Sequence, residues 1–452
     1  MALLRLANAL STFYPRQSEV KRLLDAMILA VPRQAQAREA TMLSKLRVKG
    51  FKSLEDVELT FPRLTVLFGP NASGKSNLLE SILTLSRLGT SRTLSDALSE
   101  PLRGYPIEMF NFPSDGLAGL LRGDEARFRL ESELLVENER FQYEVEVEMQ
   151  TKSGNLAVTD EYLAALSGKG EPRGNPSIER VAGQIRIRRK SRPAHSREER
   201  VRQNHTLLSD PRWAGQEYRA IERCRRDLEH WRVHYLDPRV AMRAAKPPQD
   251  VTDIGVLGEN IAPFLYRLNS MEPKAFDAIK RTVRSVIPSI EDLIVDLDER
   301  RGTLDIMVRQ NGTTFSSRIL SEGTLRVMAL SAIVVNPWGG SLVGFEEPEN
   351  GVHPRRLELI ADLLGWMACN QGKQVIVTTH SALFCEAILR KAMKAPDEIS
   401  VVNLSRSGRQ TEIHALDPTS PLFTNPEITQ GLTSDREDGV FQGLLVRGML
   451  DG

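Results

Sequence analysis

Residues 69–76 read Gly69-Pro70-Asn71-Ala72-Ser73-Gly74-Lys75-Ser76, and this stretch decides the fold expected for the 452-residue chain. An apolar run at 64–68 precedes it, as in a buried parallel strand, and a helix is predicted to begin near Lys75. The pattern G-x-x-x-x-G-K-[ST] between a strand and a helix predicts a phosphate-binding loop. Its glycines let successive backbone N–H groups close around phosphate oxygens, and the helix N-terminus adds a partial positive charge.

The side chains of this loop predict ATP and Mg²⁺ as cofactors. Lys75 is placed to reach the β- and γ-phosphates, and the Ser76 hydroxyl is placed to ligate Mg²⁺. The predicted nucleotide contacts comprise Gly69, Asn71, Ser73, Gly74, Lys75, Ser76 and Asn77.

Two carboxylates follow a second apolar run, in the segment Ser341-Leu342-Val343-Gly344-Phe345-Glu346-Glu347-Pro348-Glu349. Mg²⁺ prefers hard oxygen ligands, so Glu346 is predicted to support the metal. Glu347 is then placed to polarise an attacking water. Taken alone, two glutamates after a short apolar run would be an ordinary solvated strand end.

Two further segments are weak signals alone and become informative through their order along the chain. Leu320-Ser321-Glu322-Gly323-Thr324 leads into a predicted helix, where a serine would serve equally as a simple N-cap. The run 374–381 has the pattern of a buried strand and ends in Thr379-His380-Ser381. A lone histidine at such a position is usually structural.

The phosphate loop, the Leu-Ser-x-Gly segment, the acidic strand and the Thr-His-Ser segment, in this order, resemble the ABC-type ATPase head. Gly-Phe-Lys-Ser-Leu at 50–54 and Glu-Glu-Pro-Glu-Asn-Gly-Val-His-Pro at 346–354 are similar to its RecF, SMC and OLD-like branch. The resemblance covers 42–104 and 316–405. It implies an α/β P-loop NTPase core, whose mostly parallel sheet is flanked by helices, with an antiparallel β layer and a mixed insertion lobe.

The resemblance also implies roles for individual residues. Glu347 would be the catalytic base, His380 would sense the γ-phosphate, and Ser321 and Gly323 would contact ATP held by a facing protomer. A homodimer through ATP-sandwiched heads is thereby implied. The sequence departs from the family pattern at Glu346, where aspartate is usual, and at Thr324, where glutamine is common, and no Q-loop glutamine is evident.

The segments divide the chain into five predicted parts. Residues 1–41 form an N-terminal extension containing one amphipathic helix, and we expect Met42 to be the physiological start. Residues 42–104 and 316–415 form the two halves of the ATPase core, 105–315 the β layer and insertion lobe, and 416–452 a C-terminal tail. OLD-like nucleases carry a TOPRIM domain, but no acidic Asp-x-Asp cluster follows His380, so we expect no nuclease activity in this chain.

The composition restricts the kinds of partner that the chain is expected to bind. Lys and Arg number 60 against 59 Asp and Glu, so any nucleic-acid surface must be local. Three dispersed cysteines and the lack of a bilayer-length apolar run favour a cytoplasmic protein without a membrane partner. Residues 186–202 carry eight basic side chains beside two glutamates, which predicts a loop or frayed helix that binds DNA, or else a merely solvated loop. Lys49 and Lys52 are weaker candidates for DNA contacts.

Outside the motifs, the pattern predicts an antiparallel strand within 125–150, helices near 216–235 and 259–285, and strands near 292–309 followed by an Asn311-Gly312 hairpin turn. The leading functional hypothesis is an ATP-dependent switch that dimerises on ATP and acts on DNA or on an effector protein such as a nuclease, in bacterial antiphage defence. The alternative is a RecF-like DNA-repair clamp, whose output is DNA binding itself. A transporter subunit is disfavoured because no membrane domain is visible.

Overall fold

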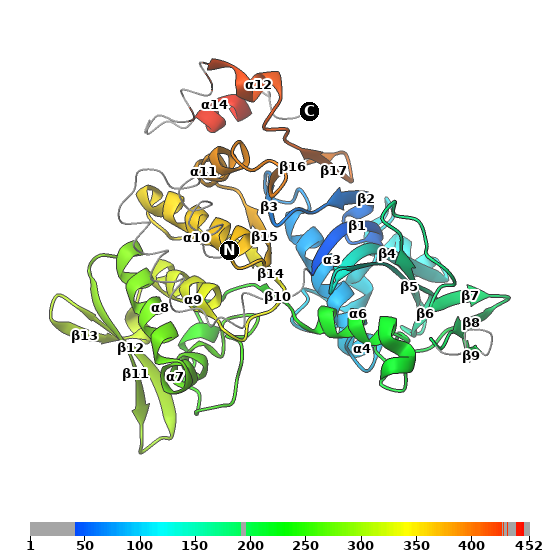
Figure 1. Ribbon diagram of the computed structural model, residues 1–452, viewed down its shortest axis with the longest axis horizontal. Coiled ribbons are helices and arrows are strands. Elements are labelled where there is room, and N and C mark those ends of the chain that lie inside the picture. Colours follow the sequence, from blue (N-terminus) through cyan, green and yellow to red (C-terminus); the bar gives the residue numbers. More distant parts are fainter. Residues whose placement is uncertain (1–40, 191–195, 427, 429–431, 433–439, 447–452) are drawn as a thin grey trace.

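The computed structural model describes residues 41–190, 196–426, 428, 432 and 440–446. Two β-sheets lie on either side of one central helix, α3 (Lys75–Leu88), and a third, smaller sheet lies apart from them (Figure 1). The amphipathic helix predicted near the N-terminus and almost all of the predicted extension fall outside the described residues. β1 begins at Met42.

The central sheet has six strands within the described residues, in the order β10-β14-β15-β3-β16-β17. Their bounds are Trp231–His234, Leu342–Glu346, Gln374–Thr379, Leu64–Phe68, Ile399–Ser407 and Gln410–Ala415. All neighbouring strands run parallel except the hairpin of β16 and β17. All five residues of β3 are buried, as its continuous apolar run predicts.

Helices cover both faces of this sheet, and α3 is the helix that the phosphate loop enters. Eleven of its fourteen residues are buried, because it packs between the central sheet and the antiparallel sheet. The opposite face is covered by α9 (Glu322–Val335), α10 (Leu357–Cys369) and α11 (Ala382–Ala392). Because β3, β14 and β15 run parallel, their carboxyl ends lie at one edge of the central sheet, beside the loop that leads from β3 into α3. A nucleotide site is expected at this edge.

The antiparallel sheet has eight strands among the described residues, in the order β2-β1-β4-β5-β6-β7-β8-β9. Their bounds are Leu54–Thr60, Met42–Phe51, Glu125–Val136, Glu139–Gln150, Leu156–Leu166, Ile178–Val181, Gln184–Ile187 and Arg197–Arg200. Residues of β5 alternate between buried and half-exposed, as the sequence predicts for a sheet with one face in the core. This face packs on α3, α4 (Leu94–Ala97) and α6 (Arg219–Glu229).

A third lobe is built from α7 (Ile261–Met271), α8 (Pro273–Val286) and the sheet of β11 (Ile290–Asp298), β12 (Thr303–Gln310) and β13 (Thr313–Ser316). Gln310 pairs with Thr313 across Asn311-Gly312, so the predicted hairpin is confirmed. The remaining elements are α5 (Gly116–Arg122), α12 (Pro421–Thr424), α14 (Val440–Val446) and the short 3₁₀ turns at 106–109, 216–218, 241–243, 317–319 and 354–356. None of the described helices has the length and apolarity that a bilayer crossing needs.

The predicted fold class, an α/β P-loop core with an antiparallel β layer and a mixed lobe, is confirmed. Two local predictions were wrong. The helix expected over 216–235 ends at Glu229, and Trp231–His234 form β10, which pairs in parallel with β14. The loop or frayed helix expected over 186–202 contains β8 and β9, which pair with each other. The segment between 105 and 315 also contributes a strand, β10, to the core sheet.

Candidate functional site

The loop at 69–76 is held in a conformation that requires glycine at position 74. Gly74 has a φ of +105°, and a Cβ there would lie 2.5 Å from the Thr411 hydroxyl oxygen, so only glycine fits. The Lys75 ammonium donates to the backbone oxygens of Gly69 (2.8 Å) and Pro70 (2.7 Å). Burial lowers the pKa of Lys75, while Glu347 and Glu346 oppose this shift. The ammonium thus folds back over an open loop, ready to exchange carbonyl partners for phosphate oxygens.

Ser76 and Glu346 meet at the start of α3 and the end of β14. The Ser76 hydroxyl donates to Glu346 Oε1 at 2.5 Å. A hydroxyl and a carboxylate are the oxygen donors that Mg²⁺ takes beside nucleotide phosphates, so these two residues fit the predicted metal. No cluster of three or more His, Cys, Asp or Glu side chains suited to a metal occurs in the described part of the chain. Phosphate oxygens and water would complete the coordination.

Glu347 lies directly beyond β14 with a φ of +47°, a left-handed conformation that only a few per cent of non-glycine residues adopt. Its carboxylate contacts His380 Nδ1 at 2.8 Å and accepts from Asn350 Nδ2 at 3.3 Å. His380 follows β15, the strand next to β14. The fold thus brings the predicted base and the predicted phosphate-sensing histidine into direct contact.

Glu349 lies two residues further on but faces inward. Its side chain accepts a hydrogen bond from the Thr379 hydroxyl, and its second oxygen has no hydrogen-bonding partner. Burial raises its pKa to about 7, against the effect of the Thr379 bond. Glu349 therefore ties the loop at 347–353, which we call the acidic loop, to the end of β15 and does not face a ligand.

Glu347 and the phosphate loop line one hollow of about 420 Å³, the nucleotide hollow. It is lined by Lys52, Ser53, residues 71–77, Glu80, Arg103, Glu347 and Arg406. Six of the seven predicted nucleotide contacts line it, and Gly69 supplies the backbone oxygen that holds Lys75. Ser321, Gly323 and His380 are not among the lining residues.

Four charged residues of the nucleotide hollow were not assigned to it from the sequence: Lys52, Glu80, Arg103 and Arg406. Glu80 is fully buried and bonds both Lys52 (2.5 Å) and Arg103 (2.8 Å). Arg103 lies 3.6 Å from Glu346, and its bond to Glu80 raises its pKa although burial opposes this. Lys52, a candidate for DNA contact, is instead 12% exposed and faces the nucleotide hollow. The sequence offered one signal for these residues, the charged Glu80 within the apolar pattern of α3.

The predicted signature segment begins a helix, as expected. Ser321 caps α9 by accepting from the Thr324 backbone at 3.1 Å. A Cβ on Gly323 would lie 2.1 Å from the Gly351 carbonyl oxygen, so the signature helix touches the acidic loop of the same chain. Ser321 itself is exposed. The structure therefore brings Gly323 to the acidic loop, and neither Ser321 nor Gly323 lines the nucleotide hollow.

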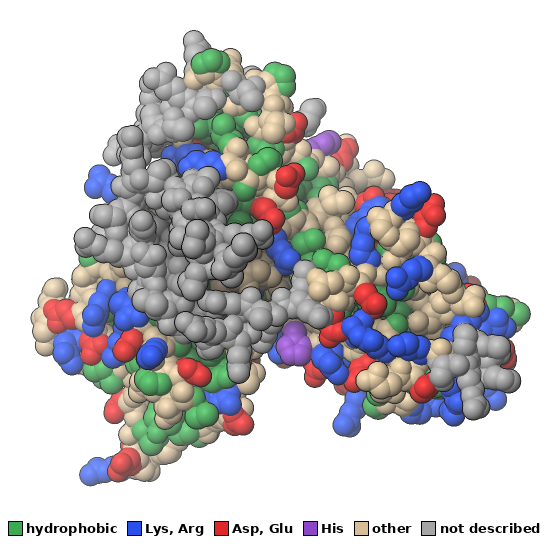
Figure 2. Space-filling view, viewed as in Figure 1, with side chains coloured by type: hydrophobic (Ala, Val, Ile, Leu, Met, Phe, Trp, Pro, Cys, Tyr) green, Lys and Arg blue, Asp and Glu red, His purple; other side chains and the backbone are tan. Residues whose placement is uncertain are grey.

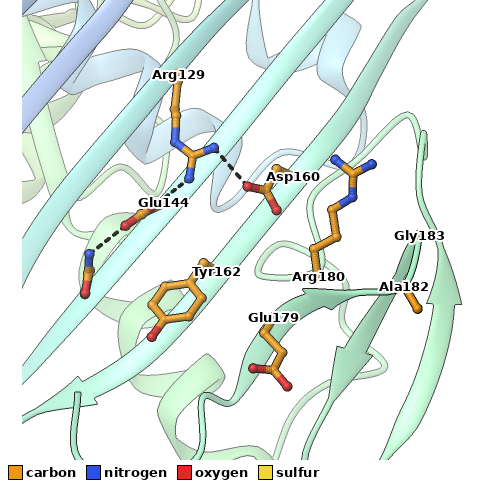
Figure 3. Close-up of a pocket in the computed structure, with 9 residues that line it drawn as sticks. Arg129, Glu144, Asp160, Tyr162, Glu179, Arg180, Ala182 and Gly183 are labelled. Atoms are coloured by element: carbon orange, nitrogen blue, oxygen red, sulfur yellow. Dashed lines mark hydrogen bonds and ion pairs between the residues drawn. The ribbon is translucent and has the colours of Figure 1, made fainter.

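A different hollow, of about 590 Å³, lies on the outer face of the antiparallel sheet (Figure 3). Arg129 points between Glu144 and Asp160 and bonds both, the latter at 2.9 Å. Glu179 is bonded by Arg188. Its charges are thus largely neutralised from within the sheet, and this hollow offers no counterpart to the phosphate loop.

The basic segment 186–202 is also partly neutralised. Arg186 lies between Glu179 and Glu198, and Arg202 contacts Glu148 at 2.9 Å. Arg188 donates to Glu179 and is 13% exposed. Arg186, Arg188 and Arg202 are therefore already paired with carboxylates, so only part of the positive charge of this segment can face a partner.

Fold and site together define an ABC-type ATPase head of the RecF- and SMC-like kind, as the resemblance predicted. A family model described as "AAA domain, putative AbiEii toxin, Type IV TA system" matches residues 64–386. Because the match covers most of the chain, the chain belongs to this family.

Curated relatives match over shorter stretches. The chain is 42% identical over 83 residues to the DNA replication and repair protein RecF of Ligilactobacillus salivarius, covering 18% of this chain and 19% of that protein. It is 30% identical over 142 residues to the RecF of Lactobacillus johnsonii, covering 30% and 35%. The matches thus span about a fifth to a third of these relatives.

Solved structures match over more of the chain at low identity. An SMC head bound to the C-winged helix domain of ScpA gives a TM-score of 0.47 at 14% identity, covering 83% of this chain and 98% of that one. The SMC head domain from Thermotoga maritima gives 0.38 at 16% identity, covering 83% and 98%.

Proposed function

We propose that this chain is an ATP-binding and ATP-hydrolysing switch that dimerises on ATP and acts on DNA or on an effector protein. The observation that carries the proposal is the position of the signature segment. Ser321 is exposed and lies outside the nucleotide hollow, while Gly323 is packed on the acidic loop that carries Glu347. A second copy that brought its Ser321 to this hollow would complete the site.

The chain's own residues have separable roles in this proposal. Lys75 and the backbone of 71–77 bind the phosphates, and Glu347 accepts the proton of the attacking water. His380 orients Glu347 through their contact and senses the γ-phosphate. Mg²⁺, held at Ser76 and Glu346, would neutralise developing phosphate charge.

Light scattering on the Glu347→Gln variant tests the switch. With ATP and Mg²⁺ the mass should double, and with ADP it should return to that of one chain. A mass that does not respond to ATP would contradict head closure.

For the biological setting we propose bacterial antiphage defence, with nuclease or toxin activity residing in a partner protein. Support comes from the family description, which names a toxin of a type IV system. A pull-down from the native host with Glu347→Gln as bait identifies the partner, because this variant should hold the closed, ATP-bound state.

A RecF-like DNA clamp is the second candidate, favoured by the curated RecF matches. In that case DNA binding is itself the output. ATPase activity stimulated by DNA with no other protein present would favour the clamp over a switch that needs an effector.

A further inference from the structure

A third hollow of about 350 Å³ lies between α6 and the ends of strands β5 and β6 in the antiparallel sheet, and we call it the α6 hollow. Its floor is apolar: Phe141 of β5 and Ile221 of α6 are almost fully buried, and Tyr218 at the start of α6 adds an aromatic ring. The nucleotide hollow, by contrast, is lined mainly by polar and charged side chains.

The rim of the α6 hollow is basic. Three exposed cations come from three separate segments: Arg173 follows β6, Lys190 follows β8, and Arg219 begins α6. Arg189 donates to the Tyr218 hydroxyl at 3.3 Å, which places a further guanidinium at the edge of the ring. Figure 2 shows Lys and Arg side chains gathered, among some carboxylates, over this part of the molecule.

The carboxylates of the α6 hollow do not cancel this charge. Only Glu139 and Glu217 line it, and Glu139 is bonded by Arg223 of α6. Arg173 approaches Glu139 no closer than 3.9 Å. An excess of cations therefore surrounds an apolar, aromatic floor.

An aromatic floor with a basic rim suits a ligand that has both a flat ring and phosphate groups. Nucleobases stack on aromatic side chains, and the phosphates beside them are held by Arg and Lys. In a duplex the bases are already stacked on one another, so only an unpaired base is free to enter a hollow of this size. Three cations from three segments exceed what one phosphate needs and suit successive phosphates along a strand.

We infer that the α6 hollow binds one unpaired nucleotide of a DNA strand, with its base on the Tyr218 floor and the flanking phosphates on the basic rim. The inference rests on the DNA-directed part of the proposed function. It replaces the linear segment 186–202 with a smaller set of residues, since only Arg188, Arg189 and Lys190 of that segment line the α6 hollow, and Arg188 is paired with Glu179.

Fluorescence anisotropy with the full chain, ATP and Mg²⁺ tests the ring. An oligothymidine strand should bind more tightly than a blunt duplex of equal length. Tyr218→Leu should weaken binding of the single strand by about 5- to 150-fold, the range for loss of one stacked base. Tyr218→Phe keeps the ring and should bind normally. ATPase activity without DNA should be unchanged in both variants, which verifies that they fold.

The rim is tested by salt dependence. Counterion release makes log K fall with log[salt] by about 0.7 per phosphate contact on single strands. The triple variant Arg173→Ser, Lys190→Ser, Arg219→Ser should therefore lower the slope by about 2. A matched variant removes three exposed cations from the α7–β13 lobe: Lys274→Ser, Arg300→Ser, Arg301→Ser. It should leave the slope unchanged.

Three results would overturn the inference while leaving DNA binding in place. They are equal binding of blunt duplex and single strand, normal binding by Tyr218→Leu, and equal slopes in the two triple variants. Competition by thymidine monophosphate as strong as by the oligonucleotide would assign the hollow to a free nucleotide and also overturn it. Absence of binding to either DNA would refute the DNA part of the proposed function as well.

Discussion

At the scale of single residues, the nucleotide site separates into groups that hold phosphate and groups that react. Lys75 lies on the phosphate loop and bonds only backbone oxygens. Glu347 lies across the nucleotide hollow on a different strand end and contacts His380. Because Lys75 is placed to hold phosphate and Glu347 to accept a proton, changes at each should have different effects.

We predict that Lys75→Ala weakens ATP binding by about 10- to 150-fold, the cost of losing a charged hydrogen-bonding partner. Glu347→Gln should keep ATP bound but lower the hydrolysis rate by at least about 100-fold, since only the base is removed. Fluorescent nucleotide titration and phosphate release measure the two effects separately. Glu299→Gln, on an exposed turn, should change neither. Hydrolysis at the normal rate in Glu347→Gln would show that Glu347 is not the base.

The buried Glu349 predicts how stability depends on pH. Its pKa of about 7 lies above the value near 4.5 expected in the unfolded chain, so the folded protein holds the proton more tightly. The resulting stabilisation is fully present below pH 4.5 and is lost as pH rises through 7. Between pH 5 and 8 this one group should lower the free energy of unfolding by about 2–3 kcal/mol.

Urea unfolding at pH 5 and pH 8 measures this. Glu349→Gln mimics the protonated acid, so its loss of stability over this range should be smaller by that amount. Glu412→Gln, on the exposed side of β17, serves as the control. Identical pH dependence in Glu349→Gln and the parent would mean that Glu349 is ionised in the folded protein.

At the scale of elements, one close contact joins α9 to the acidic loop. Gly323 leaves no room for a side chain against Gly351, whose own φ is +77°. A helix that begins at the signature segment is thereby fixed to the loop that carries Glu347 and Glu349. Movement of one requires movement of the other.

We predict that Gly323→Ala displaces the acidic loop and lowers ATPase activity by about 100-fold, as expected for a shift of about 1 Å in a catalytic group. Affinity for ATP should be nearly unchanged, because Gly323 does not line the nucleotide hollow. Gly168→Ala is the control for a glycine-to-alanine change without a steric clash, because a Cβ there meets no atom within 4 Å. Equal loss of nucleotide affinity and activity would show that the contact supports folding in general.

Elements with a strong periodic or motif signal were predictable from the sequence. β3, β14 and β15 are short, apolar and followed by polar motif residues, and each was expected where it lies. β10 was missed because Trp231–His234 continue directly from α6 and are too short to show alternation. β8 and β9 were missed because strand pairing with neighbours, not local propensity, fixes a basic segment in a sheet.

The same limit applies within the nucleotide site. The residues of the phosphate loop were predicted because the motif is contiguous. Arg103 and Lys52 were not, since the buried Glu80 that pairs with both lies far from them in the sequence. Contacts made by folding over long sequence separations leave no local pattern.

At the scale of the whole molecule, one chain carries a nucleotide hollow and a signature segment that do not meet. A dimer in which each segment serves the other's hollow would have two equivalent sites. Lys75→Ala and Ser321→Arg should then each be inactive alone, because each change damages both sites of its own dimer.

Mixing these two variants should restore activity. In a heterodimer, one site joins the intact Lys75 of one chain to the intact Ser321 of the other. With random exchange and independent sites, about a quarter of the parental ATPase activity should return. Light scattering on the same mixtures establishes whether dimers form. Dimers without recovered activity would mean that both sites must act together, and ATP-independent mass without recovery would place hydrolysis within a single chain.

The position of β3 in the central sheet sets the order in which the molecule can be completed during synthesis. β3 (Leu64–Phe68) pairs only with β15 and β16, which begin at Gln374 and Ile399. At 5–20 residues per second, the ribosome needs about 15–60 s to make the intervening chain. Through that interval, the antiparallel sheet and α3 can form, whereas the phosphate loop lacks the strands that flank it. The nascent chain therefore acquires its proposed nucleotide site only after β15 and β16 have been made, and nucleotide binding can report that both strands flanking β3 are in place.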